Sequence, residues 1–211
     1  MSDVSDSVTA YLARDPIIQR LPHSRIALYQ RRDFLGADQC AALIALIDKD
    51  RRPSTIADDN GDVAFRTSET CDLDPAAPPV KALEVQFAAL NGLDPKFGEP
   101  CQGQRYAVGQ EFKAHTDYFT PGGPDYKKFC SDSGQRTWTF MVYLNTVEAG
   151  GATRFKVIGK TFQPGAGKLL CWNNARPDGS VNPATLHHGM KVRKGVKYII
   201  TKWYRELPWP R

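Results

Sequence analysis

The chain has 211 residues, of which 41% are hydrophobic and 24% are charged. This composition is typical of a soluble globular protein, and the length allows one sizeable domain but not two large ones. No apolar run approaches the roughly 20 residues needed to span a bilayer. The polar, acidic start at Met1–Ala10 lacks the basic and apolar stretches of a signal peptide. We therefore expect a cytoplasmic protein that does not act in a membrane.

The formal charge of +5 and the pI of about 8.9 make the chain mildly basic, which favours an anionic substrate or partner. The basic residues occur as short pairs such as Arg31-Arg32 and not as a tract, so we expect no nucleic acid partner. The five cysteines are scattered, with no Cys-x-x-Cys pair. In a chain without a secretion signal, this spacing argues against a disulfide framework and against a structural zinc site.

We expect residues 1–22 to be a loosely attached lead-in, with a short helix between Tyr11 and Leu21 that packs on the body. Residues 23–211 would form a single domain, with helical support in 23–98 and a jelly-roll core in 99–206. A strand is predicted at 25–29, and apolar residues at helical spacing predict helices over 37–49 and 78–91. Gly36 would cap the first of these helices, and Gly92 would end the second. The polar stretch 50–74 contains a strong turn signal at Asp58–Gly61.

Beyond Glu99, short strand-like runs alternate with turns rich in glycine and proline, which is typical of a β-sandwich or barrel. Because the helices precede the strands, we expect them to pack against one sheet. The predicted fold is α+β, mainly β: a double-stranded β-helix, or jelly roll. The loop at 118–136 is predicted to be a lid or a substrate-contacting segment. The predicted strands are 103–108, 111–115, 137–144, 152–155, 168–172, 184–187 and 197–204.

A His-x-Asp motif is the strongest chemical signal. Alternate residues of a strand face the same side, so His115 and Asp117 can present a nitrogen and an oxygen to one metal ion. Since His187 and His188 are adjacent, at most one of them can supply a third ligand. Two histidines and one carboxylate form the facial triad of non-haem Fe(II) oxygenases, which leaves three coordination positions open. The alternative is that His115 and Asp117 are a surface pair beside a turn.

A lysine interrupts the apolar strand that ends the chain. Lys197 is either exposed at a sheet edge or paired with an anion, because an unpaired buried charge is costly. The far carboxylate of a dicarboxylate cosubstrate would be such an anion, since charge-assisted hydrogen bonds are strong in a pocket of low dielectric constant. The strand pattern alone leaves both interpretations open.

Four ordered motifs resemble those of the prolyl 4-hydroxylase family of 2-oxoglutarate- and Fe(II)-dependent dioxygenases. The resemblance covers roughly residues 25–206. The chain departs from the family pattern at Ala152, where the family has Glu, and at Lys191, where it often has Pro. The motifs are Y-x-x-G-x-x-F-x-x-H-x-D-Y-F from Tyr106, R-x-x-T-F-x-x-Y-L-N from Arg136, G-G-x-T-x-F from Gly150, and H-x-G-x-x-V-x-x-G-x-K-Y from His187.

The resemblance implies a catalytic set of four residues. His115, Asp117 and His187 would be the iron ligands, and Lys197 would hold the far carboxylate of 2-oxoglutarate. His187 fits better than His188, because the valine and lysine of the family motif then fall on matching residues of this chain.

The resemblance also suggests further contacts. Tyr106 and Thr139 would help to hold 2-oxoglutarate, and Trp203 would face the cavity. Arg66 and Tyr118 would contact the substrate. All of these except Tyr118 also have a purely structural interpretation: core packing for Tyr106 and Trp203, strand formation for Thr139, and a salt bridge for Arg66.

The activity implied by the resemblance is hydroxylation of an unactivated C–H bond of a prolyl residue in a peptide or protein. Fe(II) would be the metal, 2-oxoglutarate and O2 would be consumed, succinate and CO2 would be released, and L-ascorbate would restore oxidised iron. A free amino acid or other small molecule is the alternative substrate. Two other classes remain: a zinc hydrolase, which would give Lys197 no role, and a non-catalytic jelly-roll binding module. The sequence does not indicate the oligomeric state.

Overall fold

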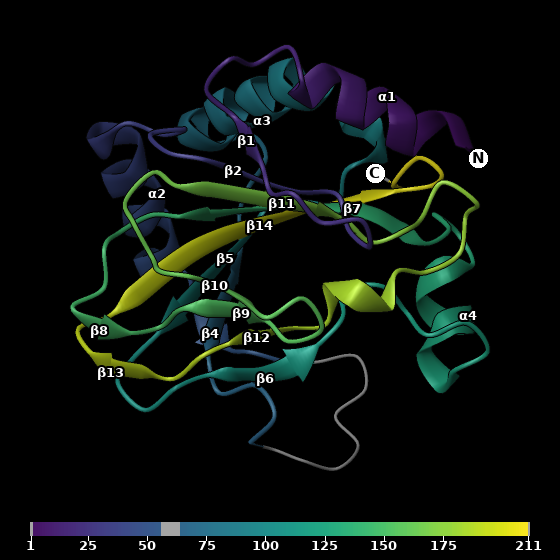
Figure 1. Cartoon of the computed structure of the whole chain (residues 1–211). Coiled ribbons are helices and arrows are strands. Elements are labelled where there is room, and N and C mark those ends of the chain that lie inside the picture. Colours follow the sequence, from purple (N-terminus) through teal and green to yellow (C-terminus); the bar gives the residue numbers. More distant parts are fainter. Residues whose placement is uncertain (1, 56–63, 211) are drawn as a thin grey trace.

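The computed structural model describes residues 2–55 and 64–210, so the predicted turn at Asp58–Gly61 lies outside the described residues. Two antiparallel sheets face each other, and helices cover the outer side of the larger sheet (Figure 1). None of the helices in this part of the chain is both long and apolar enough to cross a membrane. The helices are α1 (Ser2–Leu12), α2 (Ala37–Lys49), α3 (Pro78–Asn91) and α4 (Pro124–Cys130), with short 3-10 turns at Pro95–Phe97 and Pro183–Thr185.

The major sheet has eight strands in the order β1-β2-β11-β7-β14-β5-β4-β3. Its longest strand, β14, runs through the centre of the molecule between β7 and β5 (Figure 1). The strands are β1 (Gln19–Arg20), β2 (Leu28–Arg31), β3 (Arg52–Pro53), β4 (Glu69–Asp72), β5 (Gln102–Tyr106), β7 (Arg136–Tyr143), β11 (Leu169–Asn173) and β14 (Lys197–Arg205).

The minor sheet has four strands in the order β10-β9-β12-β6 and lies on the side away from α1 and α3 (Figure 1). A two-stranded ribbon, β8–β13, adjoins it. This double-layered antiparallel arrangement is the predicted jelly roll. The remaining strands are β6 (Phe112–His115), β8 (Ala149–Gly150), β9 (Thr153–Phe155), β10 (Lys160–Phe162), β12 (His187–Gly189) and β13 (Val192–Lys194).

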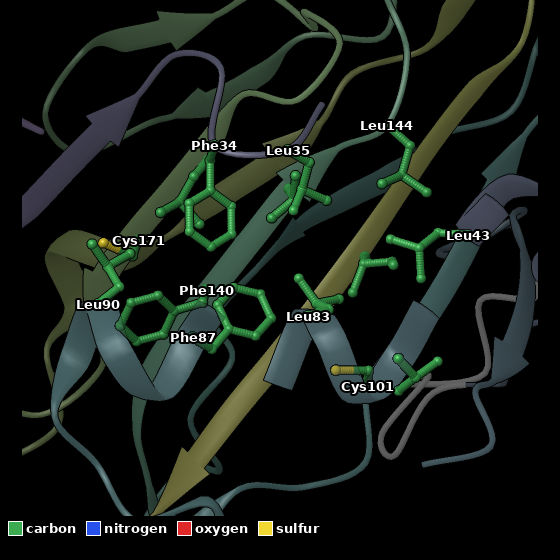
Figure 2. Close-up of a cluster of buried hydrophobic side chains, with 14 of the residues drawn as sticks. Phe34, Leu35, Leu43, Leu83, Phe87, Leu90, Cys101, Phe140, Leu144 and Cys171 are labelled. Carbon is green, nitrogen blue, oxygen red and sulfur yellow. The ribbon is translucent and has the colours of Figure 1, made fainter. Parts of the chain in front are cut away.

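Helices α2 and α3 have the predicted bounds, because both are amphipathic and a glycine marks the start of α2 and the end of α3. Gly36 occupies the N-cap of α2, and Gly92 ends α3 in the left-handed conformation with φ of 68°. The buried side of α3 packs on the major sheet, where Phe87 meets Phe34 at 5.6 Å and Phe140 at 5.8 Å between ring centroids (Figure 2). Burying such side chains is worth about 1.5–3 kcal/mol each.

A second cluster of buried side chains fills the space between the two sheets. It includes Met141 and Trp172 from the major sheet and Phe155 from the minor sheet. The rings of Phe155 and Trp172 meet edge to face with centroids 5.2 Å apart. This inner layer holds the sheets in register around the inward-facing side chains of β6 and β12.

The lead-in differs from its prediction. Its helix is α1, which begins before Tyr11, and residues 19–20 form an edge strand instead of helix. Val8 and Leu12 are fully buried, and α1 packs against α3, so the helix of this segment packs on the body, as expected. The apolar residues on both sides of Pro16 suggested one helix, but proline ends a helix at its own position or before it.

Other boundaries also shifted. The strand expected at 25–29 is β2, three residues later, and the strand expected at 184–187 begins only at His187. Residues 183–185 instead form a 3-10 turn, because the Asn182 side chain accepts a hydrogen bond from the backbone N–H of Ala184. The loop expected at 118–136 contains α4. The short strands β3, β4, β8, β10 and β13 were not predicted.

Candidate metal and cosubstrate site

The three predicted metal ligands lie close together at the end of the minor sheet. His115 ends β6, His187 begins β12, and the two residues are paired across the sheet. Asp117 follows β6 by two residues, with its Oδ1 3.7 Å from His115 Nε2 and 4.0 Å from His187 Nε2. The potential ligand atoms of all three residues lie within 4.8 Å of one another. This spacing fits a single metal ion.

The backbone fixes the orientation of both imidazole rings. His115 Nδ1 lies 2.7 Å from the carbonyl oxygen of Lys113, and His187 Nδ1 lies 2.9 Å from that of Thr185. When Nδ1 donates to a carbonyl, Nε2 is left unprotonated and can bind a metal. Burial, followed by the neighbouring His187, lowers the pKa of His115 to about 3. The ring is therefore neutral, as a metal ligand requires.

Asp117 is buried, but it remains a carboxylate. Burial alone would raise its pKa, yet its surroundings, His187 first and Arg136 among them, hold it below the ordinary value. Thr139 also donates a hydrogen bond to Asp117 Oδ2 at 2.7 Å. With Oδ2 engaged in this way, Oδ1 is the oxygen that faces the two imidazoles.

The hydroxyl of Thr139 has other partners than the predicted one. It was expected to hold 2-oxoglutarate, but its hydroxyl donates to Asp117 and accepts a hydrogen bond from Asn174 Nδ2 at 2.8 Å. It does not line the chamber described below. Thr139 therefore orients a potential metal ligand, a role that depends on a contact between residues 22 positions apart.

Substituting Thr139 by valine is expected to weaken metal binding about tenfold. The change keeps the shape of the side chain but removes a hydrogen bond to a carboxylate, and loss of such an outer partner typically costs 10–100-fold in metal affinity. Titration of the apo-protein with Mn(II), followed by electron paramagnetic resonance, measures this. Thr137→Val is the matched control, because Thr137 bonds to the carbonyl of Tyr204 and should leave Mn(II) affinity unchanged.

A narrow chamber leads inward from the triad and ends at Lys197. Its wall includes Tyr106, Gln104, Thr201 and Trp172. The free volume is about 30 Å³, so a five-carbon diacid can enter only if side chains move. Tyr106 donates a hydrogen bond to Gln104 Oε1 at 2.6 Å. The structure thus places Tyr106 and Lys197, both buried, together in the wall of the chamber.

Lys197 is only 1% exposed and forms no ion pair with any residue in the described ranges 2–55 and 64–210. Its ammonium lies 4.8 Å from the ring centroid of Tyr106 and 5.5 Å from that of Tyr143. Burial lowers the pKa of Lys197 to about 7. Of the two interpretations left open by the sequence, exposure at a sheet edge is therefore excluded, and the lysine is a buried cation suited to an incoming anion.

Binding of 2-oxoglutarate is expected to weaken as the pH rises above about 7, by up to about tenfold per pH unit. Burial has lowered the pKa of Lys197, so its ammonium is present below that pH and is lost above it. The bound far carboxylate of 2-oxoglutarate would raise the pKa of Lys197 again. Binding at a pH above about 7 is therefore accompanied by uptake of a proton by the lysine. Calorimetry between about pH 6 and 8 (roughly one unit either side of the lysine pKa) measures this, with 2-oxobutyrate, which lacks the far carboxylate, as the control.

A larger groove opens from the other side of the triad, with a volume of about 630 Å³. Trp203, which is 8% exposed, lines both this groove and the inner chamber, as expected of a residue that faces the cavity. Tyr118 and Arg66 line the groove as well. Tyr126 and Phe129 of α4 form part of the wall, so the loop at 118–136 contributes directly to the groove.

With the carboxylates of the described residues, Arg66 does not form the structural salt bridge that was its alternative interpretation. Its guanidinium donates to Ser68 Oγ at 3.1 Å, Thr70 Oγ1 at 3.0 Å and Gln102 Oε1 at 3.0 Å, all of which are neutral. Burial lowers its pKa. No carboxylate pairs with Arg66 among the residues that the structure describes, so its positive charge at the groove wall is uncompensated.

Sequence reasoning missed an ionic cluster in the wall of the groove. Arg136 binds Glu99 through two contacts of 2.6 and 2.7 Å, and Arg205 lies 3.3 Å from the same carboxylate. Arg136 also stacks on the ring of Trp203 at 3.9 Å and donates to the carbonyl of Asp117 at 3.3 Å. The only sequence signal was the arginine at the start of the motif that begins at residue 136.

His188 points away from the triad, as expected for the neighbour of a ligand on a strand. Its Nε2 lies 2.9 Å from Glu111 Oε2 on the outer side of the minor sheet. His188 and His187 therefore occupy opposite faces of the same strand, and only His187 can reach a metal held by Asp117.

Comparison with known proteins gives a consistent result. Residues 101–205 match the 2OG-Fe(II) oxygenase superfamily. The chain is 34% identical over 205 residues to human prolyl 4-hydroxylase subunit alpha-3, covering 93% of this chain and 37% of that protein. It therefore spans little more than a third of the length of the first curated relatives.

Two solved structures are similar. One is the viral collagen prolyl hydroxylase of Paramecium Bursaria Chlorella virus-1 in complex with 2OG, with a TM-score of 0.64, 26% identity and coverage of 84% of this chain and 95% of that one. The other is a prolyl hydroxylase from Trichoplax adhaerens in complex with a hypoxia inducible factor peptide fragment. Its TM-score is 0.61 at 16% identity, with coverage of 97% and 90%, and it supports the fold alone.

Proposed function

Because the chain belongs to the prolyl 4-hydroxylase-like family of 2-oxoglutarate- and Fe(II)-dependent oxygenases, we propose that it hydroxylates a prolyl residue in a peptide or protein. 2-Oxoglutarate and O2 would be consumed, and succinate and CO2 released. The observation that carries the proposal is the buried Lys197, a cation without a carboxylate partner among the described residues, in the chamber that the triad closes.

Each residue of the site would have its own role. His115, Asp117 and His187 would hold Fe(II), which when bound supplies the activation of O2. Lys197 would bind the far carboxylate of 2-oxoglutarate beside Tyr106, which directs the oxo-acid end of the cosubstrate toward the metal. Thr139 would keep the carboxylate of Asp117 in place.

Trp203 would separate the cosubstrate from the substrate groove, since it lines both cavities. Arg66 and Tyr118 would contact the substrate. An arginine without a carboxylate partner suits the carbonyl oxygens of a peptide, which accept hydrogen bonds along the whole backbone.

The groove favours a polypeptide substrate over a free amino acid. Its volume of about 630 Å³ is several times that of a single proline, and it is open to solvent. Several aromatic side chains line it, including Tyr118, Phe119, Tyr126 and Phe129. Aromatic-lined grooves are a recurrent means of binding extended, proline-containing segments. The name of the viral protein likewise refers to collagen.

The two other classes fit the site less well. A zinc hydrolase needs a general base near the metal in addition to its ligands. Glu99, the nearest other carboxylate of the ionic cluster, is bound by Arg136 and Arg205 and cannot serve as that base. A non-catalytic binding module would not need a complete triad together with a buried lysine.

Two further parts of the proposal rest on the reaction class and the sequence alone. L-Ascorbate would act as the reductant that restores oxidised iron. The cytoplasm would be the location.

The first experiment does not require the substrate. Anaerobic apo-protein is titrated with Fe(II) and then with 2-oxoglutarate, and the visible charge-transfer band of chelated cosubstrate is recorded. Proline-containing peptides are then incubated aerobically and examined by mass spectrometry for the gain of one oxygen, with succinate measured in parallel. A band followed by equal amounts of succinate and hydroxylated peptide supports the proposal. Hydroxylation of free amino acids but of no peptide would contradict it.

A further inference from the structure

The segments that form the minor sheet and the neighbouring β8–β13 ribbon carry the whole excess of positive charge in the chain. Segments 111–115, 148–162 and 187–195 contain seven Lys and Arg residues and two Glu residues, whereas the whole chain has 28 basic and 23 acidic residues. The rest of the chain is therefore balanced, with 21 of each sign. We call this surface the basic face; its cations are Lys113, Arg154, Lys156, Lys160, Lys191, Arg193 and Lys194.

The two carboxylates of these segments neutralise only part of the basic face. Lys191 lies 3.6 Å from Glu111, and Lys194 lies 2.7 Å from Glu148. Four of the other cations are exposed and form no ion pair with any residue in the described ranges, so their charge is available to a partner. These are Arg154, Lys156, Lys160 and Arg193.

The basic face continues the wall of the groove. Strand β6 is the last strand of the minor sheet, and its Phe112 and His115 line the groove. Residues 65–67 hydrogen-bond to its other edge. On the next strands, Arg154 and His188 are paired across β9 and β12, with both side chains on the outer side. A polypeptide that leaves the groove across β6 therefore passes directly onto the basic face, on the side of the molecule away from α1 and α3 (Figure 1).

We propose that the basic face binds an acidic segment of the polypeptide substrate, outside the residues that occupy the groove. This inference rests on the proposed function, since it names the class of protein that the enzyme would prefer. Exposed charge pairs are individually weak. Several together are expected to favour an acidic substrate by about tenfold at low salt and to lose this effect at high salt, where exposed charges are screened.

The chemistry of the face favours an acidic polypeptide over other polyanions. Proteins that bind single-stranded nucleic acid present aromatic rings on which bases stack. Here the aromatic residues of β9 and β10, Phe155 and Phe162, are buried on the inner side. Membrane surfaces are bound by apolar side chains that insert beside the cations. The only exposed large apolar residue of these segments is Val157, which is 38% exposed.

The test uses the full chain with Fe(II) and 2-oxoglutarate and two sets of peptides. All share one core with the proline that the enzyme hydroxylates. This core is extended at either end by a run of about six aspartates or serines, enough to contact several cations. KM is measured from succinate release at low and high salt. The variant Arg154→Glu/Lys156→Glu/Lys160→Glu reverses the basic face. The matched control Arg32→Glu/Lys49→Glu/Lys81→Glu makes the same change of net charge at exposed residues elsewhere.

The wild type and the control variant are expected to show a KM about tenfold lower for the aspartate peptides, while the basic-face variant retains less than about a twofold preference. Affinity for 2-oxoglutarate should be equal in all three proteins. Equal KM values for aspartate and serine peptides in the wild type would overturn the inference, as would an unchanged preference in the basic-face variant. Tighter binding of an oligothymidylate or of phosphatidylserine vesicles, with displacement of the aspartate peptide, would also overturn it.

This result is separable from the proposed function. If no peptide is hydroxylated, the proposed function fails. Fluorescence anisotropy of a labelled aspartate peptide on wild type, basic-face variant and control then still decides whether the basic face binds acidic chains.

Discussion

Replacing Lys197 by methionine is expected to weaken 2-oxoglutarate binding by about 30-fold to several thousandfold, because truncating one member of a buried charge pair costs about 2–5 kcal/mol. Methionine fills a similar volume without the charge. The dissociation constant of 2-oxoglutarate in the metal-loaded protein, measured by calorimetry, gives the effect.

The same substitution should leave binding of 2-oxobutyrate nearly unchanged, since that oxo-acid has no far carboxylate to lose. The melting temperature of the cosubstrate-free protein should stay constant or rise, because an uncompensated buried cation is replaced by an apolar side chain. Equal losses for both oxo-acids, or a lower melting temperature, would indicate that Lys197 supports the fold and does not recognise the cosubstrate.

How far the sequence predicted this structure depends on how local the signals are. Helices α2 and α3 were predicted to the residue, since each has a buried stripe and a glycine at one end. The central strands of the major sheet were found within one or two residues, because long apolar runs mark them. By contrast, β8, β10 and β13 have only two or three residues, too few for a period to be seen.

Helix α4 shows a different limit. Its seven residues, Pro124–Cys130, follow a run of glycine and proline that is typical of a loop. The helix is held by contacts with distant residues: Phe129 stacks on Phe119 at 5.1 Å, and Arg205 donates to the Phe129 carbonyl. Tertiary contacts of this kind override the local preference.

The site residues likewise differ in how local their sequence signals are. The spacing of two residues between His115 and Asp117 was informative because strand geometry turns it into proximity. The place of His187 could be chosen only through the family motif. The bond from Thr139 to Asp117 could not be predicted, because it depends on which strands of the two sheets face each other.

Substituting His187 by alanine is expected to reduce metal affinity by more than about 100-fold and to abolish turnover. A direct ligand is lost, whereas loss of an outer partner alone costs about 10–100-fold. Titration of the apo-protein with Fe(II) under anaerobic conditions, followed by the visible band of the 2-oxoglutarate complex, measures the loss. His187→Asn keeps more of the side-chain volume beside Trp172, and shows whether a cavity contributes.

His188→Ala is the matched control, because the adjacent ring lies on the outer side of β12 and pairs only with the half-buried Glu111. That pair is partly exposed, so its loss should change stability by less than about 1 kcal/mol. Metal affinity and the visible band should both survive. If His188→Ala removed the metal while His187→Ala retained it, the strand would carry its ligand on the opposite face and the triad would be wrong. Loss in both variants, with both proteins still folded by circular dichroism, would show that the conformation of β12 matters more than one imidazole.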